Sequence, residues 1–87
     1  MTLHPGVRTR IDQIENLYGV GLSDLKNGGS FRKFVDARQH LWWMLCKQDG
    51  FSLTRAARVT GHHHTTVLYG VRQCQARLET QPERSAA

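Results

Sequence analysis

The chain has 87 residues, of which 39% are hydrophobic and 22% charged, and this composition is typical of one globular domain with one core. Its 12 Lys and Arg outnumber its 7 Asp and Glu, which gives a net charge of +5 with neutral histidines. No apolar run approaches the roughly 20 residues of a membrane span, and the first residues lack the pattern of a signal peptide. We therefore expect a cytoplasmic domain with no membrane partner.

The excess positive charge is confined to the segment 31–72. This segment of 42 residues holds seven basic residues and two acids, whereas the rest of the chain holds five of each. Four of the five histidines also lie in the segment. This localisation favours a polyanion as the ligand.

The first part of the chain predicts two helices and a loop. A helix is expected over 7–18, because apolar residues recur there at helical spacing and Gly19 follows in the position of a C-terminal cap. A short helix is expected over 23–26, with Ser23 as its N-cap. The run Asn27-Gly28-Gly29-Ser30 breaks the periodicity and predicts a loop.

The second part predicts three more helices. One is expected to begin at an Asp36 N-cap and to run to about Gln48, and Gly50 is expected to end it. Of the two tryptophans in this helix, one is expected in the core and the other partly exposed. Ser52 is the expected N-cap of a helix through Thr60. Gly61 then makes a turn before a last helix, from about residue 63 or 64 to 78 or 79.

This order predicts an all-α, five-helix bundle-like domain over 1–79, with a helix-turn-helix at about 52–79 and a flexible tail over 80–87. We expect neither catalysis nor a cofactor, since no Ser-His-acid set or pair of carboxylates stands out. No nucleotide is expected either, because Gly28-Gly29-Ser30 lacks the lysine and the spacing of a phosphate loop. Cys46 and Cys74 fit no metal or disulfide pattern and are expected to be buried free thiols.

Three adjacent histidines, His62, His63 and His64, suggest a metal site at first sight. On a helix, however, consecutive side chains point about 100° apart, so they do not chelate one ion. Neither cysteine lies at zinc-ligand spacing from them. We therefore expect no metal.

The same stretch suits the reading of DNA. A neutral imidazole donates or accepts a hydrogen bond, and a threonine offers a methyl group to thymine and a hydroxyl to a base edge or phosphate. A helix N-terminus also presents free N–H groups to phosphate. His64, Thr65 and Thr66 meet these demands, although one of the threonines could instead be an N-cap.

At these residues the chain resembles the C-terminal DNA-binding domain of the bacterial replication initiator DnaA, from about Arg10 to Leu78. Residues 18–25, Tyr-Gly-Val-Gly-Leu-Ser-Asp-Leu, are similar to the family's Y-x-[VI]-x-x-x-D-L opening. Ala37-Arg38-Gln39 is similar to its [AP]-R-Q helix start, and Ser52-Leu53 opens the same short helix. Gly61 with the run His64-Thr65-Thr66-Val67-Leu68 is similar to the signature G-x-x-H-T-T-V.

The resemblance implies a TrpR/DnaA domain IV-like fold that binds double-stranded DNA in the bacterial nucleoid. It implies that Thr65 and its neighbours read bases in the major groove and that Thr66 holds a phosphate. It also implies phosphate contacts from Arg38 and Gln39.

Two departures from the family bear on specificity. His63 replaces an acid that usually precedes the signature histidine, so His62 and His63 are where an altered sequence preference is expected. The loop before the third helix is arginine-rich in the family but is Gly28-Gly29-Ser30 here, which leaves Arg32 and Lys33 as its cations.

With 87 residues from Met1 the chain leaves no space for an ATPase domain, so we expect a stand-alone DnaA-like protein that regulates replication initiation or transcription. Other phosphate contacts are expected from Arg55, Arg58 and Arg72, with Arg32 and Lys33 as further candidates. A protein-interaction module that kept the fold but lost DNA affinity is one alternative, and a binder of structured RNA is another. The target site, the oligomeric state and any protein partner stay open.

Overall fold

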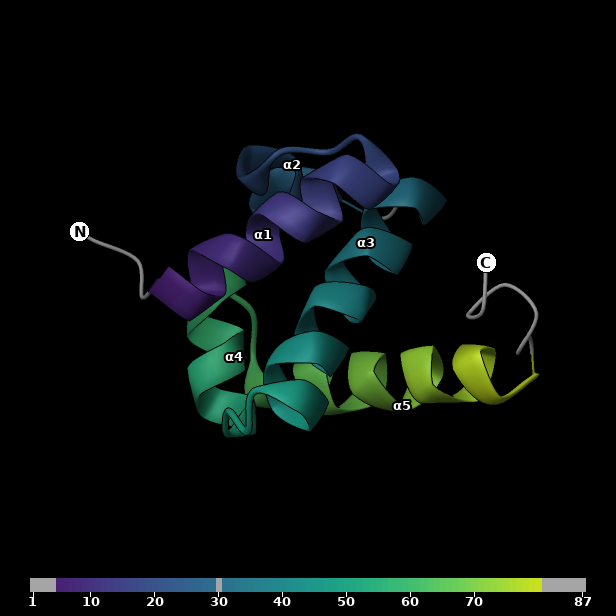
Figure 1. Ribbon diagram of the computed structural model, residues 1–87. Coiled ribbons are helices and arrows are strands. Elements are labelled where there is room, and N and C mark those ends of the chain that lie inside the picture. The colour runs from purple at the N-terminus through teal and green to yellow at the C-terminus, as the bar shows by residue number, and fades with distance from the viewer. Residues whose placement is uncertain (1–4, 30, 81–87) are drawn as a thin grey trace.

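A computed structural model describes residues 5–29 and 31–80, and these two stretches are helical without a strand (Figure 1). The elements in chain order are α1 (Pro5–Tyr18), α2 (Leu22–Asn27), α3 (Arg32–Trp43), the π-helical segment η1 (Met44–Gln48), α4 (Leu53–Thr60) and α5 (His64–Thr80). The expected all-α class with five α-helices is therefore confirmed for this part of the chain. None of its helices is long and apolar enough to cross a bilayer.

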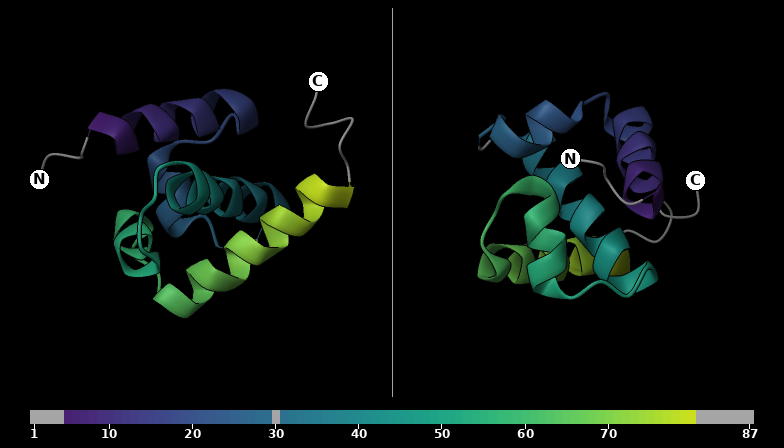
Figure 2. Two further views of the ribbon diagram at one scale, coloured as in Figure 1. Left: turned by 60° about the horizontal axis from the view of Figure 1, so that its bottom comes forward. Right: turned by 90° about the vertical axis from the view of Figure 1, so that its left-hand side faces the viewer.

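The core lies around α3, which has α1 on one side and α5 on the other (Figures 1 and 2). Trp42 is 2% exposed, and near the end of α3 it bonds to Thr60 of α4 and packs against Gly70 of α5. Aliphatic residues from all the helices and from the turn after α1 complete this core: Val7, Ile11, Ile14, Val20, Leu25, Leu41, Leu45, Ala56, Ala57, Val67 and Val71. The single core expected from the chain length is thus built mainly on one central helix.

The first two helices end and begin at glycines. Gly19 has a φ of 68° and its N–H donates to the carbonyl of Glu15, so it ends α1 as predicted. The N-cap of α2 is Gly21, whose N–H donates to the Asp24 carboxylate at 3.1 Å. The prediction of Ser23 as the N-cap is therefore wrong, because an acid at the third helical position caps the helix instead.

The N-cap of helix α3 lies five residues before the predicted one. It is Phe31, whose side chain makes no capping bond, so the sequence carries no capping signal there. The prediction of an Asp36 N-cap is wrong, since Asp36 lies in the second turn and pairs with Arg32 at 3.4 Å. At its other end α3 widens into η1, and Gly50, with a φ of 74°, ends the run as predicted.

A bidentate ion pair joins α1 to the turn after η1. Nε and Nη2 of Arg10 donate to the two carboxylate oxygens of Asp49 at 2.9 and 2.8 Å. Both side chains are about a quarter exposed, which shields the pair in part from water. This contact fixes the position from which the chain enters α4.

Helices α4 and α5 are joined by the three residues 61–63. Ser52 Oγ accepts the N–H of Arg55 at 3.1 Å, which confirms the predicted N-cap of α4. Gly61 adopts a left-handed φ of 76°, and the N–H groups of Gly61 and His62 both donate to the Ala57 carbonyl. The predicted helix, glycine turn and helix are therefore present, and Thr80 belongs to α5. The rest of the predicted tail, 81–87, lies outside the described residues.

Candidate nucleic-acid interface

The N-terminus of α5 exposes a row of small polar and imidazole side chains. His63, His64, Thr65 and Thr66 are all exposed, and they lie just after the turn that follows α4. Val67 behind them is fully buried and anchors the first turn in the core. The polar edge is thus presented outward from a rigid base.

His63 is the residue that caps α5. Its Nδ1 accepts the backbone N–H of Thr65 at 3.2 Å and also lies 2.7 Å from Oγ1 of Thr65. An imidazole nitrogen accepts these bonds only when it carries no proton, so the cap requires the neutral ring protonated at Nε2. The alternative that Thr65 or Thr66 is the N-cap is therefore wrong, because an imidazole takes the place of the usual hydroxyl or carboxylate.

This cap decides what Thr65 offers to a ligand. Its hydroxyl hydrogen points to His63, so the oxygen lone pairs and the methyl group remain for an outside partner. Thr65, Tyr69 and Arg72 follow one another at spacings of four and three, and all three are exposed. They form an outward stripe along α5 opposite its buried face.

His62 packs against the core and helps to hold the turn in place. Trp42 Nε1 donates to Oγ1 of Thr60 at 3.1 Å, and Thr60 Oγ1 lies 2.9 Å from Nδ1 of His62. Because an indole N–H only donates, the threonine hydroxyl accepts from Trp42, and the direction of its bond to the imidazole follows the tautomer of the ring. The imidazole also meets the Trp42 ring edge-on, with 5.3 Å between centroids. The turn is therefore tied to the core through three side chains.

Burial lowers the pKa of His62 below its usual value, and the nearby positive charge of Arg38 lowers it further. Partial burial thus favours the uncharged imidazole. His62 therefore adds no charge to the interface near neutral pH.

Three exposed arginines lie on the two helices that the turn joins. Arg55 and Arg58 lie on α4 and Arg72 lies on α5, and all three are exposed. The guanidinium of Arg55 lies 4.1 Å from the centre of the Phe51 ring, which holds it over the start of α4. Arg32 and Lys33, also exposed, lie at the start of α3. These five predicted cations are accessible to a polyanion.

The structure places Arg38 and Gln39 differently. Each is 8% exposed. Nε of Arg38 donates to the carbonyl of Leu25 at 2.7 Å and Nη2 to that of Gly29 at 3.1 Å, so the guanidinium ties α3 to α2 and its following loop. Burial lowers the pKa of Arg38. Arg38 thus has a structural role that the sequence did not indicate, and its phosphate contact stays a prediction.

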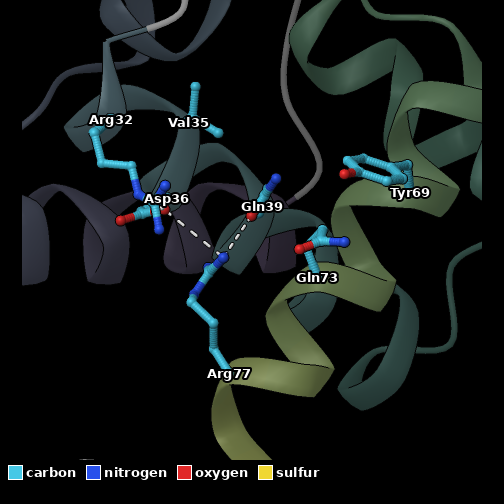
Figure 3. A pocket seen from close by; sticks show the side chains of 7 residues that line it. All are labelled: Arg32, Val35, Asp36, Gln39, Tyr69, Gln73 and Arg77. Atoms are coloured by element: carbon cyan, nitrogen blue, oxygen red, sulfur yellow. Dashed lines mark hydrogen bonds and ion pairs between the residues drawn. The ribbon is translucent and has the colours of Figure 1, made fainter.

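A polar hollow between α3 and α5 was not predicted. It has a volume of about 240 Å³ (Figure 3), and its lining is Arg32, Val35, Asp36, Gln39, Tyr69, Gln73 and Arg77. Tyr69 is 62% exposed, and its hydroxyl is turned toward the hollow. The sequence contains one signal for Tyr69: its spacing of four residues from Thr65 places both side chains on the same face of a helix.

The remaining predicted side chains are mostly structural. Trp42 is buried and Trp43 is half-buried, which confirms the prediction of one core and one partly exposed tryptophan. Nε1 of Trp43 donates to Oε1 of Gln75 at 2.7 Å. Both cysteines are free thiols; Cys74 is buried, but Cys46 is only half-buried. Residues 5–29 and 31–80 hold no group of three or more His, Cys, Asp or Glu arranged to bind a metal ion.

Over 69 residues, or 78% of its length, the chain is 30% identical to the chromosomal replication initiator protein DnaA of Pelobacter propionicus. The chain is similar to one region of a DnaA protein. It spans only 15% of the length of that relative. No family model matches the chain, and no solved structure matches it.

Proposed function

We propose that this chain binds double-stranded DNA in a sequence-specific way, with α4 and α5 acting as a helix-turn-helix. The region of DnaA that it corresponds to is the C-terminal DNA-binding domain. The exposed edge at the start of α5 carries this proposal, because it combines two threonines and two imidazoles at the N-terminal end of a helix with exposed arginines on α4 and α5. Over 53–80 the chain has four arginines and a single acid, Glu79, so the surface attracts phosphate.

Each residue of the edge has a role in this proposal. Thr65 accepts a hydrogen bond from a base amino group, since its own hydroxyl hydrogen is directed to His63. Thr66 binds a backbone phosphate. His64 contacts a base edge from the first helical position, where its ring stacks on His63 with 4.3 Å between centroids.

His63 explains how the sequence preference would differ from that of the initiator. Its Nδ1 is used by the helix cap, so only Nε2 of the neutral ring remains, and that atom is a donor. An acid at this position would present acceptors alone. The protein would therefore select a base with an acceptor, such as N7 or O6 of guanine, where an acid selects an amino group.

Phosphate contacts come from the exposed cations Arg55, Arg58, Arg72, Arg32 and Lys33. Neutralising about three to five phosphates would make log affinity fall against log salt with a slope of about −3 to −5. A protein with these properties would regulate replication initiation or transcription, for example by competing for initiator sites. We propose no catalytic activity, cofactor or bound nucleotide for it.

The test is a selection of bound sites from random DNA duplexes, followed by affinity measurements on the selected duplex. The double variant Thr65→Ala with Thr66→Ala is expected to lose the preference for that duplex. Both side chains are exposed, so the variant should keep its thermal unfolding midpoint. If no duplex is bound at low salt, the proposal fails and the protein-interaction alternative takes its place. If structured RNA outcompetes duplex DNA at equal salt, RNA is the ligand.

A further inference from the structure

We infer that the hollow between α3 and α5 holds a backbone phosphate of the bound DNA, with Tyr69 and Arg77 as its contacts. This inference rests on the proposed function. It adds two residues to the interface, and it identifies Asp36 as an acid that restrains the affinity.

The lining of the hollow is rich in hydrogen-bond donors. Five of its seven side chains carry N–H or O–H groups: Arg32, Gln39, Tyr69, Gln73 and Arg77. Oε1 of Gln39 accepts from Arg77 Nη1 at 2.6 Å, which leaves the amide nitrogen directed away from Arg77 (Figure 3). Neither that nitrogen nor the Tyr69 hydroxyl has a hydrogen-bond partner among residues 5–29 and 31–80. Unpartnered donors that converge on one hollow suit an anion with several oxygens.

The position of the hollow along α5 also fits a phosphate. Tyr69 lies one helical turn after Thr65, so it is about 6 Å further along the helix axis. A helix whose first turn reads base edges meets the sugar-phosphate backbone within its next turns, because the major groove is about 12 Å wide. The hollow opens beside those turns, with α3 as its second wall (Figure 3).

Arg77 lines the hollow, and two side chains of α3 hold its guanidinium in place. Its Nη1 lies 3.7 Å from Oδ1 of Asp36, and the same Asp36 oxygen lies 3.4 Å from Nε of Arg32. The two arginines and one acid leave a net positive charge in the hollow. An incoming phosphate would share the arginines with Asp36, whose charge repels it and lowers the affinity.

The test measures binding by fluorescence anisotropy on the duplex obtained by selection and on a random duplex of about 20 base pairs, two helical turns. Tyr69→Phe removes only the hydroxyl and should weaken binding to both duplexes about three- to tenfold. Arg77→Gln should reduce the magnitude of the salt slope by about one. Arg8→Gln is the matched control for charge loss, because α1 lies on the far side of α3 from α5 (Figure 2).

The decisive variant is Asp36→Asn, which removes the opposing charge and keeps the side-chain shape. We expect it to bind both duplexes about threefold more tightly, whereas a purely structural role of Asp36 predicts weaker binding or no change. Inorganic phosphate added at constant ionic strength should leave DNA binding unchanged; inhibition by it would mean that the hollow binds a free anion.

The outcomes separate the two proposals. If the wild type binds DNA and the threonine double variant does not, but Tyr69→Phe and Asp36→Asn both match the wild type, this inference is wrong and the proposed function stands. If the wild type binds no duplex, the proposed function itself fails.

Discussion

Gly70 on α5 lies directly against the indole ring of Trp42 on α3. A Cβ atom at position 70 would lie 2.5 Å from Cε3 and 2.7 Å from Cζ3 of that ring, far inside the usual separation of carbon atoms. Trp42 is 2% exposed and its N–H is bound to Thr60, so the ring is fixed in place. The missing side chain therefore sets how closely α5 approaches α3 and where the reading edge lies.

Replacing Gly70 by alanine should destabilise the fold by about 1–3 kcal/mol, because the added methyl overpacks a filled core. This direction is opposite to helix propensity, which favours alanine by about 1 kcal/mol. Urea unfolding followed by circular dichroism measures the change. The exposed Ala76, changed to glycine, gives the propensity effect alone. Stabilisation by Gly70→Ala would show that α5 is not packed as described.

The Trp42–Thr60–His62 relay predicts a second loss of stability. Thr60→Val keeps the side-chain shape but leaves the buried indole N–H and the imidazole Nδ1 without their partner. The expected cost is about 1–3 kcal/mol. Thr54→Val, at an exposed position of the same helix, should stay within about 0.5 kcal/mol of the wild type. Equal effects of the two variants would contradict the relay.

Acidification should destabilise the protein through its half-buried histidines. Burial lowers the pKa of His62, and burial with the charge of Arg77 lowers that of His40. The unfolded chain therefore binds more protons than the folded one just below pH 6.5, the ordinary pKa. Stability is full above that pH and falls as the pH drops toward the folded-state values.

Urea unfolding at about pH 7.5 and 5.5 measures this dependence. In His62→Asn, an amide group replaces Nδ1 as the partner of the Thr60 hydroxyl and nothing titrates at that position, so the loss of stability on acidification should be smaller. An identical pH dependence in the variant and the wild type would exclude His62 as a cause.

The imidazole cap on α5 predicts a graded series at position 63. His63→Ala removes the acceptor for the Thr65 N–H and should cost about 1 kcal/mol, whereas His63→Asp keeps an acceptor and should hold the stability. The same two variants separate capping from base reading, because His63→Asp should alter the selected DNA sequence. If His63→Ala unfolds at the same urea concentration as the wild type, the cap contributes nothing.

The parts of the fold that local chemistry determines were predictable from the sequence. Ser52 and Gly61 act within their own turns, so the sequence indicated the start and end of α4 correctly. The start of α3 was missed because Phe31 makes no capping bond, while Asp36, which looks like a cap, pairs with Arg32 one turn earlier. An N-terminus without a polar cap leaves no local signal.

The candidate site was predictable along α5 but not across helices. The exposure of Thr65 and Thr66 follows from helical periodicity once Val67 is placed in the core. The burial of Arg38 depends on the carbonyls of Leu25 and Gly29, which reach it only through the packing of α2 on α3. The hollow between α3 and α5 likewise exists only in the folded arrangement.

The most direct test of the central claim is a titration of the labelled protein with the selected duplex, followed by amide chemical shifts in nuclear magnetic resonance spectra. The predicted result is that the largest shifts fall on residues 63–66 of the turn and α5 and continue through Tyr69 to Arg72. Amides of α1, on the far side of α3, should change little (Figure 1). Shifts concentrated on α1 and η1, or no shifts at low salt, would contradict the claim that the start of α5 reads DNA.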